Sequence, residues 1–64
     1  MSAAPARPPV TPIESRDQYH VYLDEIATLA AIDPEKGSAD AVRMRELVDA
    51  IEAYERDQFP DMFP

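Results

Sequence analysis

Residues 38–60 constrain the fold more than any other stretch, because they have the pattern of one long amphipathic helix. At 100° per residue, large apolar side chains recur at the i, i+3, i+4, i+7 spacing of a core-facing stripe. The stripe consists of Met44, Leu47, Val48, Ile51 and Tyr54. The opposite side is charged and carries two (i, i+4) pairs, Arg45 with Asp49 and Glu52 with Arg56. The stripe therefore needs an apolar surface to pack against.

An earlier stretch predicts a first helix that could provide this surface. Ser15 is a good N-cap, and Gln18 three residues later completes a capping-box pattern. One face of the helix is apolar and contains Tyr19, Tyr22, Leu23, Ile26, Leu29 and Ala30. Asp33 precedes Pro34, and a residue before proline is disfavoured in the α region, so the helix should cover about residues 16–31.

A short turn joins the two helices. It holds the one glycine of the chain, Gly37, and Ser38 can cap a second helix over about residues 39–58. Two helices joined in this way form an antiparallel hairpin. The sequence therefore predicts an all-α fold, a two-helix hairpin spanning residues 13–60.

Two tails flank the hairpin. Residues 1–12 are rich in proline and alanine and predict an extended, polyproline-like tail, although Pro8-Pro9 could also dock in an aromatic groove. Residues 61–64 form an apolar C-terminal tail. Together with the end of the second helix they bring three large apolar side chains to this end, Phe59, Met62 and Phe63. These side chains either fold back over the hairpin or are offered to a partner as anchors.

Size limits what the hairpin can bury by itself. A chain of 64 residues without cysteine has no disulfide or cysteine-based zinc site to stabilise it. Small scaffolds of this kind usually associate with another chain. We therefore expect either a dimer that closes a four-helix bundle or a hairpin completed by a different protein.

The net charge is −7, from thirteen acidic and six basic side chains. This excess argues against direct binding of nucleic acid or an anionic membrane, because both depend on lysine and arginine. It favours a basic protein surface as the partner. No apolar run approaches the roughly 18 residues of a membrane span, and no secretory signal is present, so we expect a cytoplasmic location.

Enzymatic chemistry finds little support in the sequence. Acidic residues lie close together along the second helix, but such spacing is routine on a solvated helix face. His20 and Asp24 are (i, i+4) neighbours without a third ligand, so an exposed ion pair is favoured over a metal site. We therefore predict no enzyme activity, no cofactor and no metal.

The order of residues resembles the N-terminal helical region of HigA-type antitoxins of bacterial toxin–antitoxin pairs. The resemblance covers about three quarters of the chain, and its most distinctive part is a Tyr-Glu pair followed by Phe-Pro. The matching positions are Ile13, Ser15, Tyr19, Leu23, Ile26, Leu29, Gly37, Leu47, Ile51, Tyr54, Glu55, Phe59 and Pro60. Family members continue into a helix-turn-helix domain, which this sequence does not contain, so operator binding is not carried over.

The resemblance implies self-association and contact with a toxin similar to the RelE-type ribonucleases, which are basic. We predict that the contact residues are Tyr54, Glu55, Phe59, Met62 and Phe63, with Asp49 and Glu52 steering the encounter electrostatically. One alternative is a dimerisation module or a fragment of a longer repressor. Another is an acidic inhibitor that mimics nucleic acid, although Arg43, Arg45 and Arg56 interrupt its carboxylate array.

Overall fold

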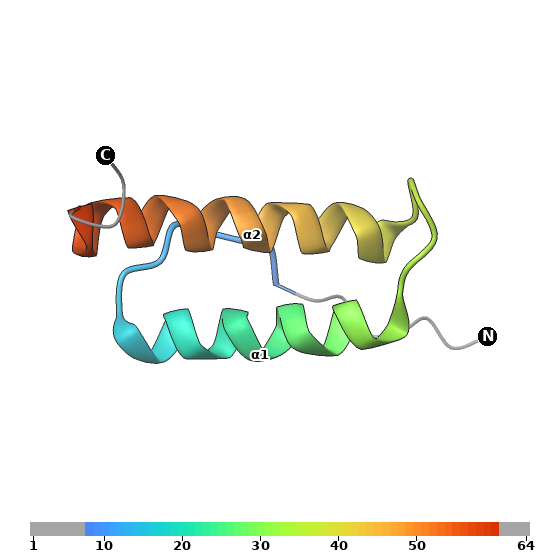
Figure 1. Cartoon of the computed structure of the whole chain (residues 1–64), viewed down its shortest axis with the longest axis horizontal. Coiled ribbons are helices and arrows are strands. Elements are labelled where there is room, and N and C mark those ends of the chain that lie inside the picture. Colours follow the sequence, from blue (N-terminus) through green and yellow to red (C-terminus); the bar gives the residue numbers. More distant parts are fainter. Residues whose placement is uncertain (1–7, 61–64) are drawn as a thin grey trace.

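The computed structural model describes residues 8–60, which form two helices joined by a short turn (Figure 1). Helix α1 spans Arg16–Ile32 and helix α2 spans Ala39–Gln58. The helices are antiparallel, since Tyr19 near the start of α1 contacts Glu55 near the end of α2. The predicted all-α hairpin is confirmed.

Both helices begin at a serine cap. Ser15 Oγ accepts a 3.1 Å hydrogen bond from the Gln18 backbone N–H, and Ser38 Oγ accepts one of the same length from Ala41. The Gln18 side chain departs from the usual capping box. Its Oε1 accepts from the backbone N–H of Glu14 at 2.9 Å, one residue before the cap, and this bond fixes how the chain enters α1.

The turn depends on two residues with positive φ. Asp33 caps α1 in the left-handed region at φ 56° and ψ 65°, and its N–H donates to the carbonyls of Leu29 and Ala30. Pro34 ends the helix as expected, but the residue before it adopts the left-handed and not the extended conformation. Gly37 has φ 81°, which a residue without a Cβ adopts at little cost.

The core is a single cluster between the helices. Its buried side chains are Tyr22, Leu29, Leu47 and Ile51, and Leu47 has no exposed surface. Further apolar side chains pack around this cluster and are partly buried, namely Val10, Ile13, Tyr19, Leu23, Ile26, Met44 and Ala50. Most of the two predicted stripes thus face each other, but Ala30 at the end of the α1 stripe is exposed, and Val48 and Tyr54 of the α2 stripe are half-buried outside this cluster.

A third layer covers one face of the hairpin. Residues 8–13, here called the strap, have no regular secondary structure and pass behind α2 in the view of Figure 1 before the chain reaches the start of α1. Val10 and Ile13 pack against the core cluster from this side. The face toward the viewer has no such cover among the described residues.

Candidate partner-binding surface

Two of the predicted contact residues, Tyr54 and Glu55, belong to an aromatic cluster at the end of α2. The rings of Tyr19 and Tyr54 lie 4.9 Å apart between centroids and 30° from parallel. The Tyr19 hydroxyl donates to Glu55 Oε2 at 2.7 Å. This hydrogen bond is the main cause of a raised pKa for the Tyr19 hydroxyl, and partial burial and the charge of Glu55 act in the same direction. Glu55 therefore holds the two helices together in the free protein.

Phe59 lies next to this cluster in sequence and ends α2. Its backbone N–H donates to the carbonyl of Glu55 at 2.7 Å, and the residue is half-buried. The other two predicted anchors, Met62 and Phe63, lie outside the described residues. Whether the three side chains act together therefore stays a prediction.

The two predicted steering residues, Asp49 and Glu52, are exposed on α2. Asp49 pairs with Arg45 at 3.3 Å, and the side chains are 59% and 80% exposed respectively. Such an exposed pair is weak and exchanges readily with solvent. Both carboxylates are therefore accessible to a partner from outside the hairpin.

An open groove of about 350 Å³ lies where the strap crosses α2. One side comes from the strap and the other from α2. Its lining residues are Val10, Thr11, Pro12, Glu46, Asp49, Ala50 and Ala53. Sequence reasoning missed this groove because proline content predicts an extended tail and does not say where such a tail docks. The available signal in the sequence was the pairing of two acidic residues, Glu46 and Asp49, with two small ones, Ala50 and Ala53, on one flank of α2.

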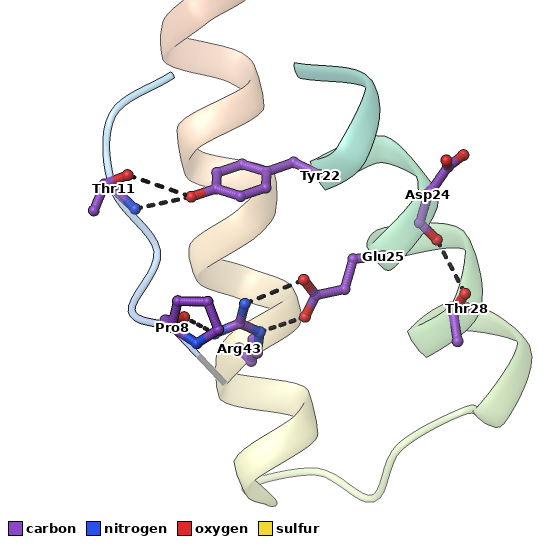
Figure 2. A network of polar contacts seen from close by, with 7 residues as sticks. All are labelled: Pro8, Thr11, Tyr22, Asp24, Glu25, Thr28 and Arg43. Carbon is purple, nitrogen blue, oxygen red and sulfur yellow. Dashed lines mark hydrogen bonds and ion pairs between the residues drawn. The ribbon is translucent and has the colours of Figure 1, made fainter. Parts of the chain in front are cut away.

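A polar network holds the strap in place (Figure 2). The Arg43 guanidinium forms a two-pronged ion pair with Glu25 across the helices, and its Nη1 donates to the Pro8 carbonyl at 2.6 Å. The Arg43 and Glu25 side chains are only 11% and 23% exposed. The hydrogen bond to Glu25 is the main cause of the raised pKa of Arg43. One cation therefore joins α1, α2 and the strap.

Tyr22 provides the second attachment. Its hydroxyl accepts from the Thr11 backbone N–H at 3.1 Å and lies 3.4 Å from Thr11 Oγ1 (Figure 2). It also accepts from Gln18 Nε2 at 3.3 Å. The Gln18 amide also donates to Thr11 Oγ1 and to the Pro12 carbonyl. The contacts with Thr11, followed by that with Gln18, lower the pKa of the Tyr22 hydroxyl because they favour the phenolate.

A metal-binding cluster is absent from residues 8–60. No group of three or more His, Cys, Asp or Glu side chains in this range could hold a metal ion. Every buried side-chain nitrogen or oxygen in the same range has a hydrogen-bond partner. Neither described helix is long and apolar enough to cross a membrane.

Comparisons of the chain with protein-family models, with curated proteins and with solved structures gave no match.

Proposed function

We propose that this protein is a small, non-enzymatic, antitoxin-like protein that neutralises a basic partner, such as a RelE-type ribonuclease toxin, by direct contact. The observation that carries the proposal is the net charge of −7 together with exposed carboxylates on the outer side of α2, at Asp49 and Glu52. The resemblance to HigA-type antitoxins supplies the class of partner. A cytoplasmic location is part of the proposal, because such a toxin acts on RNA there.

The aromatic end of α2 would supply most of the affinity. Buried aromatic anchors usually dominate binding energy, while charges outside the contact mainly accelerate association. Tyr54 and Phe59 are half-buried and so retain surface for a partner. Glu55 would bind a partner's cation while it keeps its bond to Tyr19, since a carboxylate can accept several hydrogen bonds.

Co-expression with the neighbouring gene tests the proposal. We expect a stable complex in a pull-down and rescue of growth when that gene is toxic. The double variant Asp49→Asn, Glu52→Gln should slow association, with a smaller effect at high salt. The matched control Asp24→Asn, Glu35→Gln removes the same charge from exposed positions outside α2 and should change association less. Recovery of the protein alone, without rescue of growth, would contradict the proposal.

Truncation after Gln58 separates the two roles open to the C-terminal residues, Phe59, Met62 and Phe63. If they anchor a partner, the truncated protein keeps its melting temperature and loses binding. If they cover the hairpin, the melting temperature falls in the free protein. Circular dichroism at 222 nm and the pull-down together distinguish these results.

A second candidate function, a self-association module, is favoured by the face of the hairpin opposite the strap. Helical spacing places several half-buried apolar side chains on this face, namely Leu23, Ile26, Met44 and Val48. Two copies packed through these faces would form a four-helix bundle. Sedimentation at micromolar concentration should then show a dimer, and Val48→Glu should give a monomer. A folded monomer of the unchanged protein would count against this function.

A further inference from the structure

The groove between the strap and α2 exists because two small residues lie under the crossing point. Ala50 and Ala53 are three residues apart and share one flank of α2. Val10 and Pro12 form the opposing wall from the strap. A larger side chain at either alanine would fill the space. The groove therefore has an apolar floor and an apolar wall.

Two carboxylates border the same groove. Glu46 and Asp49 are also three residues apart, and each lies four residues before one of the alanines. The Glu46 side chain forms no hydrogen bond or ion pair with other described residues, and its negative charge contributes to the raised pKa of Arg43. Among residues 8–60, the Asp49 carboxylate pairs only with Arg45, and this pair is exposed. The acidic edge is therefore available to a cation from outside.

We infer that this groove binds one arginine or lysine side chain of a basic protein partner. The methylene stem would lie on Ala50, Ala53 and the strap, and the cationic head would reach Glu46 and Asp49. Long basic side chains combine an apolar stem with a charged head, which matches this division of the groove. The inference rests on the proposed function in one respect, that the partner is basic.

The site depends on the docked strap. Val10, Thr11 and Pro12 form its wall, and the strap is held by Arg43 at Pro8 and by Tyr22 at Thr11. Arg43 and Tyr22 are thus positioning residues that do not touch the bound cation. Undocking the strap would remove half of the groove and leave the carboxylates in place.

The probe is N-acetyl-arginine amide, and N-acetyl-citrulline amide is its neutral match in shape. We expect the arginine probe to give saturable amide shifts in ¹⁵N NMR spectra, concentrated on the groove residues of α2 and the strap. The citrulline probe should give none. Amide shifts of equal size near acidic residues throughout the chain would overturn the inference, because they would indicate non-specific screening of charge by the probe.

Four variants sharpen the test. Ala53→Leu fills the groove without changing charge, and it should abolish the saturable shifts while the spectrum stays folded, since Ala53 is exposed. Glu46→Gln should weaken binding by about two- to fivefold, as for an exposed ion pair. Arg45→Gln should strengthen binding, because it removes the cation that competes for Asp49. Glu35→Gln, in the turn, is the charge-matched control and should have little effect.

Unchanged binding by Ala53→Leu would overturn the groove as the binding site. This outcome is separate from failure of the proposed function. The probe experiment requires no toxin, and a partner complex that forms equally well with Ala53→Leu would keep the proposed function while removing the groove from it.

Discussion

The Tyr19 hydroxyl donates a 2.7 Å hydrogen bond to Glu55 Oε2, and this contact joins the first turn of α1 to the last turn of α2. The two residues are 36 positions apart in the chain. Their hydrogen bond closes the end of the hairpin that lies opposite the connecting turn. A residue predicted from the sequence to contact a partner thus also has a role inside the free protein.

The tyrosines should titrate in a fixed order. The pKa of Tyr22 is lowered and that of Tyr19 is raised, so Tyr22 should ionise first as pH increases, and Tyr19 after it. NMR of ¹³C-labelled tyrosine, assigned with Tyr19→Phe and Tyr22→Phe, measures this order. Ionisation of Tyr19 before Tyr22 would contradict the hydrogen bonds described for both hydroxyls.

The pKa shifts of Tyr19 and Tyr22 should change the stability of the fold in opposite directions as pH rises. The Tyr19 pKa is higher in the folded state, so its contribution is complete below the unfolded value of about 10 and is lost as pH rises through the folded pKa. The Tyr22 pKa is lower in the folded state, so ionised Tyr22 favours folding above about pH 10. Urea unfolding of the two Phe variants at pH 8 and pH 11 should separate these effects.

Replacing Arg43 should destabilise the protein far more than replacing Arg45. Arg43→Gln leaves the partly buried Glu25 without its cation and frees the strap at Pro8, which should cost about 2 kcal/mol. Arg45→Gln removes only an exposed pair and should cost less than about 0.5 kcal/mol. Urea unfolding followed by circular dichroism measures both. Equal losses would show that the Arg43 network is not maintained in solution.

Leu47 should be the most sensitive core position, since it is the side chain with no exposure. Leu47→Ala should cost about 3 kcal/mol or more through lost burial and the cavity left behind, a large part of a small domain's stability. We expect the cooperative unfolding transition to be lost or strongly shifted. Leu47→Met keeps the volume and should cost less than about 1.5 kcal/mol. Val42→Ala, at a residue that is 53% exposed, should change stability by less than about 0.5 kcal/mol.

Substitutions at the two turn residues with positive φ should change the stability of the protein in opposite directions. Gly37→Ala should destabilise the protein by about 1 kcal/mol, because alanine is strained at this positive φ. Steric clash should add nothing, since an added Cβ would have no neighbour within 4 Å. Gly37→Asn should lose less, since asparagine tolerates this region. Asp33→Gly should stabilise slightly, by about 0.5 kcal/mol, because glycine adopts the left-handed cap without strain. Melting temperatures measured together would test all three directions.

Periodicity and capping residues predict most of the fold, because these signals are local. The stripe from Met44 to Tyr54 and the serines before each helix are sufficient to locate α2 and to start both helices. The strap could not be found in this way. Its position depends on Arg43 reaching Pro8 and on Tyr22 reaching Thr11, and nothing in the spacing of these residues indicates that they meet.

In the candidate surface, too, the features set by local sequence could be predicted and those set by tertiary contacts could not. Exposure of Asp49 and Glu52 follows from their place on the charged side of an amphipathic helix. The hydrogen bond between Glu55 and Tyr19 could not be predicted in this way, because a carboxylate at position 55 is equally compatible with exposure to solvent. The groove requires knowledge of both the helix flank and the segment that crosses it, so it appears only in three dimensions.

The attachment of Pro8 to Arg43 sets the order in which the chain can fold during its synthesis. The strap leaves the ribosome before either helix, but its anchoring cation follows 35 residues later. Until α2 has emerged, the strap has its contacts with Tyr22 and Gln18 of α1 but lacks Arg43, and the apolar face of α1 lacks the stripe of α2. The nascent chain therefore completes its core only after α2 has been synthesised, and slowing the ribosome within the first helix should not advance folding.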